Sequence, residues 1–254
     1  MALFVVIPLG MVVYYSFTDE SGSFTLSNFR FISQNFSTIL DSLETAVVST
    51  AVCLVLAYPL SLIMMNLSVK RQRMMNILIM LPMWMNFILR ICSWQIILEN
   101  NGILNQIFGI LGFGPYQMLN TTGAVVVGTV YNFLPFMVLP IYSVMSKISK
   151  PVLEASRDLG CNYFQMLRRV IFPLSIPGVI SGITMVFVPA ASTFIISRRL
   201  GNYNLIGDTI EQYYVGTAPD MHAGSILSLV LMIVILISMA IMNHFDDAED
   251  VVIM

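Results

Sequence analysis

The sequence predicts an all-α integral membrane protein with six transmembrane helices. Of its 254 residues, 57% are hydrophobic and only 10% are charged, whereas a soluble domain carries about 25% charged residues. The mean hydropathy is +0.83. The apolar residues gather in long runs, and about 20 consecutive apolar residues are enough to cross the hydrocarbon core of a bilayer. A surface of this composition lies mostly in lipid, so the bilayer is the first expected partner.

Five apolar runs are long enough to span a membrane, namely residues 43–66, 74–98, 122–145, 176–197 and 224–243. A further run, residues 2–17, precedes them; it is short and contains Pro8. A cleaved signal peptide is the alternative for this run, but no basic segment precedes it and no A-x-A site follows it. We therefore expect a short first helix.

Basic residues predict the orientation of these runs, because cytoplasmic loops carry an excess of Lys and Arg. When residues 2–17 are counted as the first run, most of the basic residues follow the second and the fourth run. These are Lys70, Arg71, Arg73, Lys147, Lys150, Arg157, Arg168 and Arg169. The opposite side has only Arg30, Arg198 and Arg199. The two basic loops are therefore expected in the cytoplasm. Six spans then place both termini in the cytoplasm, together with the tail 244–254.

The loop after the fourth run has the pattern of two helices joined by a sharp turn. Pro151 fits a first helical position, and Gly160 fits the residue just after a helix end. Asn162 and Gln165 have the spacing of a capping box that starts a second helix, and Pro173 is expected to end it. The sequence thus predicts an exposed, rigid elbow near Gly160, which is able to transmit force from a partner.

The same loop resembles the "EAA" loop of ABC importer permeases, whose pattern is E-A-A-x3-G-x9-I-x-L-P. The residues that carry the likeness are Glu154, Ala155, Ser156, Gly160, Phe172 and Pro173. The spacing from Glu154 to Pro173 matches in full. Ser156 stands in place of Ala, Val170 in place of Ile and Phe172 in place of Leu. These changes are mild and leave a helical elbow in place.

The chain from about Asp41 onward is similar to the spermidine/putrescine permease subunits of the PotB type. The likeness is carried most clearly by residues 155–200, and it continues through residues 204–208 and 240–243. After Leu200 the family usually has a second glycine, whereas here the sequence is Gly201-Asn202-Tyr203. This outer loop is therefore expected to differ locally.

The resemblance implies the MetI-like fold of a type I ABC importer permease in the bacterial cytoplasmic (inner) membrane. A transmembrane domain of five core helices would occupy residues 43–243, with its coupling loop at about 146–175. Residues 1–42 would form the first, peripheral helix and an outer loop. The residues implied in coupling to an ATPase are Glu154, Ala155, Ser156, Asp158, Gly160, Arg169, Phe172 and Pro173.

ATP hydrolysis is expected on another chain, because the sequence has no G-x-x-x-x-G-K-[ST] motif. The resemblance implies a cytoplasmic ATPase dimer that holds ATP and Mg, a second homologous permease and an extracytoplasmic polyamine-binding protein. This chain would be non-catalytic and without a cofactor. The isolated His222 and His244 argue against a metal site, and the net charge of -2 argues against nucleic acid.

An ion-coupled secondary transporter is the alternative from another class, since such carriers place carboxylates at membrane depth. No Asp or Glu lies in the middle of a predicted span. Arg90 is the only charge well inside one; it would pair with Glu44 or Glu99, or reach the outer surface. An intramembrane enzyme is a third alternative, but no Ser/His pairing supports it.

A pathway for a polyamine would offer aromatic faces and amide oxygens to its charged amines. The candidates are Tyr58, Trp84, Asn86, Trp94, Tyr131 and Asn132, although aromatic residues near span ends are also common as interface anchors. Asp208 and Glu211, in the last outer loop, are candidates for contact with the binding protein or the arriving cation. An ordinary solvated loop is the alternative there.

Two glycines predict helix packing. Gly178 and Gly182 form a G-x-x-x-G pattern at the start of the fifth predicted span, residues 176–197. Such spacing lets two helices approach closely. We expect this approach to occur within the chain.

Overall fold

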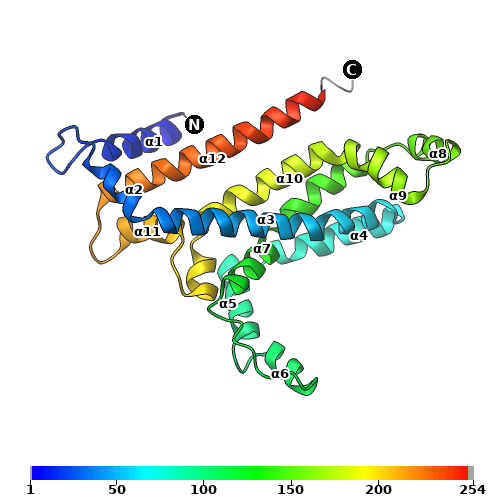
Figure 1. Cartoon of the computed structure of the whole chain (residues 1–254), viewed down its shortest axis with the longest axis horizontal. Coiled ribbons are helices and arrows are strands. Elements are labelled where there is room, and N and C mark those ends of the chain that lie inside the picture. The colour runs from blue at the N-terminus through cyan, green and yellow to red at the C-terminus, as the bar shows by residue number, and fades with distance from the viewer. Residues whose placement is uncertain (1, 251–254) are drawn as a thin grey trace. The chain divides into compact units, whose positions relative to one another are not determined.

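The computed structural model describes the backbone of residues 2–250 and the side chains of residues 3–242. The described chain is helical, with one isolated β-bridge between Thr18 and Phe24. Its α-helices are α1 (Ala2–Ser16), α2 (Arg30–Gln34), α3 (Phe36–Met65), α4 (Val69–Met80), α5 (Phe87–Leu98), α6 (Ile103–Ile110), α7 (Thr122–Met145), α8 (Lys150–Asp158), α9 (Tyr163–Met166), α10 (Phe172–Ser192), α11 (Ile206–Val215) and α12 (Met221–Asp250) (Figure 1). The expected all-α membrane fold is confirmed.

Four helical segments of the described chain are long and apolar enough to cross a membrane: Phe36–Met65, Thr122–Met145, Tyr163–Ser192 and Met221–Met242. A fifth span arises if the bent pair Val69–Trp84 and Phe87–Ile110 counts as one. The apolar helix Leu3–Ser16 is shorter than these. The predicted fourth span, residues 122–145, has the same bounds as α7.

The expected third span, residues 74–98, is not one helix. A 3₁₀ turn, Leu81–Trp84, follows α4 and carries Pro82 near its start. The chain then bends by 92° before α5. The side-chain oxygen of Asn86 accepts hydrogen bonds from the backbone N–H groups of Ile88 (2.9 Å) and Leu89 (3.4 Å), so it caps the start of α5. Proline and this cap together separate the two halves.

Pro173 does not end the helix that begins after Asn162, so this expectation is wrong. One helical segment runs from Tyr163 to Ser192, and a π-turn, Leu167–Ile171, lies just before the proline. Proline has no N–H to donate, and its ring crowds the carbonyl four residues earlier. The wider π-turn accommodates both effects. The fifth span therefore starts earlier than the expected residue 176, and it ends at Ser192.

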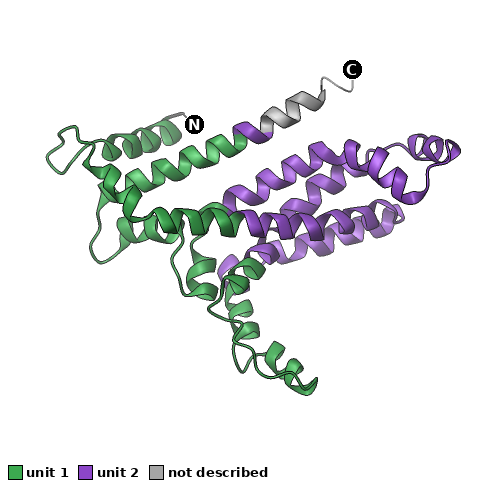
Figure 2. Cartoon of the chain, viewed as in Figure 1, with its two compact units in different colours: residues 1–46, 91–128, 191–239 green, residues 47–90, 129–190, 240–254 purple. Residues whose placement is uncertain are grey.

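The chain divides into two compact units (Figure 2). Unit 2 consists of Val47–Arg90, Thr129–Ala190 and Ala240–Met254. Its helices α7 and α10 approach closely, as the G-x-x-x-G pattern predicts. A Cβ at Gly178 would lie 2.9 Å from the carbonyl oxygen of Pro140, and one at Gly182 would lie 2.8 Å from the sulfur of Met137. At Gly178 a larger residue would require a shift of the α7 backbone, whereas at Gly182 the Met137 side chain would have to move.

Unit 1 consists of Met1–Ala46, Ile91–Gly128 and Ala191–Met239. Its apolar core joins the first turns of α3 to α11 and α12 through Ile39, Ile206, Ile226 and Leu227. The hydroxyl of Ser42 accepts a hydrogen bond from the backbone N–H of Ile206 at 2.7 Å. This bond satisfies a donor at the start of α11. The segment between α10 and α12 is thereby fixed to α3.

Candidate functional site

The turn after α8 is held by hydrogen bonds between backbone groups. Gly160 has φ +81°, the left-handed conformation that favours glycine. Its N–H donates to the carbonyl oxygen of Arg157 at 2.8 Å, and the N–H of Cys161 donates to that of Ser156 at 3.1 Å. These two bonds form a Schellman motif, which satisfies the last carbonyl groups of the helix. The predicted helix stop at Gly160 is confirmed.

The start of α9 is fixed by a capping box. The side-chain oxygen of Asn162 accepts a hydrogen bond from the backbone N–H of Gln165 at 2.8 Å. In return, the backbone N–H of Asn162 donates to the side-chain oxygen of Gln165 at 3.0 Å. This pair was predicted from the sequence and is confirmed. Because both sides of the turn are capped, α8 and α9 meet at a defined angle rather than through a loose loop.

Apolar side chains project outward from the two helices and the turn. Val152, Leu159, Tyr163 and Phe164, here called the elbow patch, are all exposed, and Leu159 is 86% exposed. Contiguous exposed apolar side chains on a soluble surface mark interaction sites. Among the described residues, those on the inner side of the elbow are instead buried, notably Ser156 and Met166. The elbow patch is therefore available to another protein.

The residues predicted to couple to an ATPase do not all lie on this outer side. Glu154, Ala155 and Asp158 are exposed along α8. Ser156 is buried; its hydroxyl donates to the carbonyl oxygen of Leu153 at 2.7 Å, so it helps to hold the turn. Arg169 is exposed within the π-turn. Phe172 and Pro173 are exposed in the first turn of α10, away from the Gly160 turn along the helix.

A hollow of about 450 Å³ lies beside α8, lined by Lys150, Glu154 and Arg157 together with the turn between α3 and α4. Gln72 fixes this turn. Its side-chain nitrogen donates to the carbonyl oxygens of Met65 (3.2 Å) and Leu67 (3.0 Å). Its side-chain oxygen accepts from the hydroxyl of Tyr142 at 3.1 Å. Helices α3, α4 and α7 are thus joined next to the elbow by one side chain that sequence reasoning did not single out.

The six pathway candidates have different surroundings. Trp84 is 78% exposed at the break between α4 and α5. Asn86 caps α5, so its oxygen is already engaged. The hydroxyl of Tyr58 hydrogen-bonds to Ser175, and Asn132 is buried. The remaining two, Trp94 and Tyr131, are partly exposed. Trp94 belongs to unit 1 and the other candidates to unit 2.

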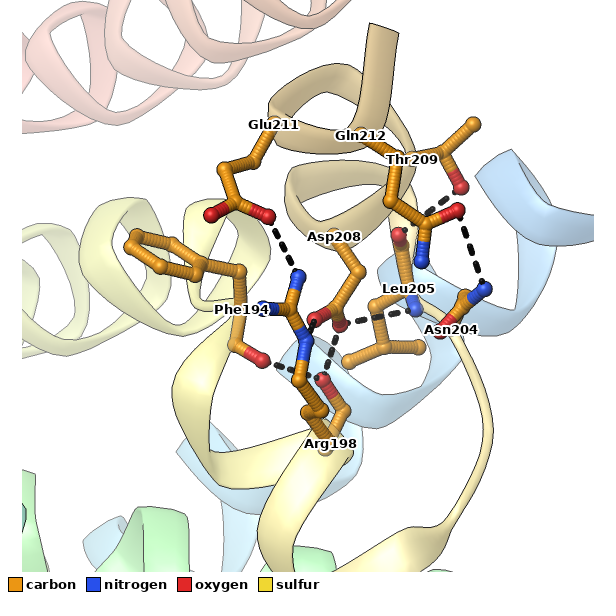
Figure 3. A network of polar contacts seen from close by, with 9 residues as sticks. Phe194, Arg198, Asn204, Leu205, Asp208, Thr209, Glu211 and Gln212 are labelled. Atoms are coloured by element: carbon orange, nitrogen blue, oxygen red, sulfur yellow. Dashed lines mark hydrogen bonds and ion pairs between the residues drawn. The ribbon is translucent and has the colours of Figure 1, made fainter. Parts of the chain in front are cut away.

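The segment between α10 and α12 contains a polar network in which Asp208 is completely buried (Figure 3). The carboxylate of Asp208 accepts hydrogen bonds from the Ser197 hydroxyl, from the backbone N–H of Leu205 at 3.2 Å and from Nε of Arg198 at 3.1 Å. The Arg198 guanidinium also binds Glu211, with 2.5 Å between Nη2 and Oε2. Asp208 therefore does not face an arriving cation, whereas Glu211 remains partly exposed.

Burial and hydrogen bonding shift the pKa of Asp208 in opposite directions. Burial raises the pKa of Asp208, and its bonds to Ser197, Leu205 and Arg198 counteract only part of that increase. The hydrogen bond to Glu211 raises the pKa of Arg198. The sequence singled out Asp208 and Glu211 only as carboxylates of the last predicted outer loop. Arg198 lies in a π-turn, Ser197–Gly201, that no sequence pattern predicted.

Comparison with known families identifies the kind of protein to which this elbow belongs. Residues 54–249 match the family described as binding-protein-dependent transport system inner membrane component. The chain belongs to this family. It is 37% identical over 246 residues to the spermidine/putrescine transport system permease protein PotB of Escherichia coli K12, covering 92% of this chain and 89% of that protein. It is 36% identical over 225 residues to PotB of Haemophilus influenzae, covering 84% and 78%.

Solved structures show the same fold at low sequence identity. A chain of a bacterial ABC transporter involved in the import of the acidic polysaccharide alginate matches with a TM-score of 0.78 at 14% identity, covering 97% of this chain and 91% of that chain. The MetNI methionine ABC transporter matches with a TM-score of 0.65 at 15% identity, covering 84% and 95%. The predicted MetI-like fold is confirmed by these matches.

As an ABC importer permease, the chain is a non-catalytic, multi-pass subunit of the inner membrane. Such a subunit works with an ATPase and a solute-binding protein, and permeases of this family have no cofactor of their own. None of the comparisons supports the alternative of an ion-coupled secondary transporter. The elbow and the polar network around Asp208 are therefore features of a transport subunit.

Proposed function

We propose that this permease forms half of the translocation pathway of an importer of polyamines, such as spermidine or putrescine. Its main support is the identity of 37% with PotB, which extends over 92% of this chain. The energy would come from ATP and Mg held by a cytoplasmic ATPase dimer. The second half of the pathway would be a homologous permease, and an extracytoplasmic polyamine-binding protein would deliver the substrate.

We propose that the elbow patch is the surface that receives the ATPase. Its apolar side chains are exposed although the turn beneath them is held by the Schellman motif and the capping box. A rigid turn passes on a displacement that a flexible loop would absorb. From Tyr163 the chain continues as one helical segment to Ser192. A movement imposed at the elbow would therefore travel along α10 into the membrane.

The orientation and domain limits follow from the same proposal. The elbow carries Lys150, Arg157, Arg168 and Arg169, as expected of a cytoplasmic loop. Both termini would then lie in the cytoplasm. The transporter domain would comprise residues 43–243, preceded by the peripheral helix and outer loop of residues 1–42 and followed by the tail 244–254.

The route of the substrate is proposed to pass the aromatic and amide side chains singled out in the sequence. Trp84 is the best supported, because a large aromatic ring is exposed at a helix break within a span. Tyr58, Asn86, Trp94, Tyr131 and Asn132 remain further candidates. At the outer side, Glu211 is the carboxylate that a binding protein or a cation would meet first. Asp208 would act through Arg198, by holding it in place.

Cross-linking with a matched control tests the docking site. Leu159 and Ile110 are both 86% exposed, the first in the elbow patch and the second in α6. Each is replaced by cysteine in a permease whose Cys53, Cys92 and Cys161 are changed to serine or alanine. In the full importer, Leu159→Cys should cross-link to the ATPase and Ile110→Cys should not. Cross-linking of Ile110→Cys alone would place the ATPase on the wrong side and refute the assignment.

Transport itself is tested in proteoliposomes that contain the complete importer. Uptake of labelled spermidine should need both ATP and the binding protein. Uptake by the permease alone, driven by an ion gradient, would instead support a secondary transporter. A sealed, ATP-hydrolysing complex that takes up no polyamine would contradict the substrate but not the coupling role of the elbow.

A further inference from the structure

Arg90 is a buried charge in the part of the chain that the structure describes. It lies in α5, and only 8% of its surface is exposed. Two of its guanidinium nitrogens, Nε and Nη1, are buried and make no hydrogen bond to any described residue. The guanidinium carbon lies 5.7 Å from the centre of the Phe87 ring. Such a cation–π contact compensates only part of the cost of burial, because a buried charge is costly unless it is paired.

Nothing in the described part of unit 2 neutralises this charge. The described side chains of unit 2 cover residues 47–90, 129–190 and 240–242, and their only carboxylates are Glu154 and Asp158. Both are exposed on α8, outside the spans. The pairs with Glu44 or Glu99 that the sequence suggested are not among the ion pairs of the described residues, which all involve Arg198. Arg90 therefore keeps a net positive charge within the bent span.

The start of α5 adds to this positive charge. The helix begins at Phe87, directly after the 92° bend. The first N–H groups of a helix carry a partial positive charge of about half an elementary charge. Asn86 engages two of them, but its amide is neutral. Arg90 follows within the first turn, so the helix end and the guanidinium raise the potential at one place. This place lies in the second half of the apolar run 74–98.

We infer that Arg90 and the amino end of α5 form an electrostatic barrier that prevents small cations from leaking through the importer at rest. This inference rests on the proposed function, a pathway for polycations beside Trp84 and Asn86. Such a pathway must offer oxygens and aromatic faces, and these would also admit sodium ions and protons. A fixed arginine and the positive ends of half-helices exclude small cations from other membrane pores. Movement of the two permeases on ATP binding would displace the barrier while the polyamine passes.

An ion pair with the second permease is the other use of a buried arginine. The neighbouring side chains that point outward at this level are apolar, namely Met85, Ile88 and Leu89, and all three are exposed. Two of the three guanidinium nitrogens of Arg90, Nε and Nη1, are instead buried inside the chain. A carboxylate of the partner would have to pass these apolar side chains to reach them. The burial of the guanidinium thus favours the barrier.

The test measures sodium leak in proteoliposomes that contain the complete importer without ATP. A potassium diffusion potential drives sodium inward, and a trapped sodium-sensitive dye reports its entry. Arg90→Met removes the charge, Arg90→Lys keeps it, and Leu89→Met is the control in the same turn. We expect Arg90→Met to leak faster on the order of tenfold, the change for a barrier lower by ~1.4 kcal/mol. Arg90→Lys and Leu89→Met should stay as tight as the wild type.

A normal leak rate for an assembled Arg90→Met importer overturns the inference. Where Arg90→Met does not assemble, Arg90→Gln decides, because its amide keeps polar groups at this position without a charge. Its leak should be faster than that of Arg90→Lys, on the order of tenfold. An assembled Arg90→Gln importer that is as tight as Arg90→Lys also overturns the inference and leaves Arg90 as an ion-pair partner. Spermidine uptake by the wild type, measured in the same vesicles, tests the proposed function separately.

Discussion

The hydroxyl groups of Tyr58 and Ser175 lie 3.1 Å apart and join the C-terminal half of α3 to the first turn of α10. Ser175 is fully buried, and it also donates to the carbonyl oxygen of Phe172 at 2.9 Å. The Tyr58 ring contacts that of Phe172, with 5.9 Å between the ring centres. The sequence predicted that the fifth span starts at residue 176, directly after this serine. In the structure, the serine instead fixes a continuous helix to α3, just beyond the π-turn.

Replacing Tyr58 by Phe should remove this link and keep the ring contact. A hydrogen bond of this kind contributes about 0.5–1.5 kcal/mol, so the thermal unfolding temperature of the purified permease complex should fall slightly. Transport should lose coupling, measured as fewer spermidine molecules moved per ATP hydrolysed. Tyr116→Phe is the control, since this tyrosine is exposed in the loop after α6. Unchanged coupling and stability in Tyr58→Phe would show that the bond has no role in either.

The left-handed backbone at Gly160 makes the elbow sensitive to substitution. No atom lies within 4 Å of a Cβ placed there, so any effect comes from φ +81° and from the new side chain rather than from a clash. Gly160→Ala should cost about 1–2 kcal/mol of local strain, while Gly160→Asn should cost less because asparagine tolerates this conformation. Gly160→Asp adds a charge beside the elbow patch.

We expect Gly160→Asp to insert into the membrane at the normal level but to lose ATPase binding, measured by co-purification of the ATPase. Gly160→Asn should retain most of the binding. Normal transport by Gly160→Asp would refute the role assigned to the elbow. Loss of membrane insertion in both variants would instead indicate a folding defect.

The elbow patch should behave as an apolar docking surface. Phe164 is 67% exposed in it, so Phe164→Glu places a charge on the surface without opening a cavity in the chain. Interface residues that bury aromatic rings commonly contribute at least about 2 kcal/mol, which corresponds to a loss of affinity of about thirtyfold or more. Titration of the detergent-solubilised permease with the purified ATPase measures this loss.

Phe24→Glu is the matched control for Phe164→Glu. Phe24 is an exposed phenylalanine in the loop after α1, which the proposed topology places outside the cell. The permease with Phe24→Glu should bind the ATPase with the affinity of the wild type. Equal losses in both variants would mean that the added charge acts on the whole complex and not on the docking surface.

Short sequence patterns predicted the elbow because the residues that begin and end its helices act over a few positions only. Pro151, Gly160 and the pair Asn162 and Gln165 act through backbone groups within four residues, and the structure places each as expected. The resemblance and the composition predicted the fold class for a similar reason, since long apolar runs leave helices as the simplest solution in a bilayer. The bounds of α7 show how well this works for an uninterrupted span.

The remaining differences come from contacts that no short window contains. Apolarity alone made residues 74–98 appear continuous, but the cap at Asn86 and the turn at Pro82 divide them. Pro173 looked like a helix end, but a π-turn lets the helix continue. Asp208 looked like a solvated loop carboxylate. Its burial depends on Arg198 and Ser197 and on a π-turn whose backbone follows no sequence rule.

The buried carboxylate of Asp208 should make the stability of the outer loop depend on pH in an unusual direction. Its pKa in the folded protein is raised, chiefly by burial. The folded state therefore binds this proton more tightly than the unfolded state, and stability falls as the pH rises through the two pKa values. The usual salt-bridged carboxylate, with a lowered pKa, shows the opposite trend.

The comparison of wild type with Asp208→Asn isolates this contribution. The difference in unfolding temperature between them, wild type minus variant, should decrease as the pH rises from about 4 to about 7, because only the wild type ionises at this position. Glu211→Gln is the control for the rest of the network, since it removes the exposed contact of Arg198 and leaves Asp208 in place. A difference that grows with pH would show that Arg198 and Ser197 stabilise the carboxylate by more than its burial costs.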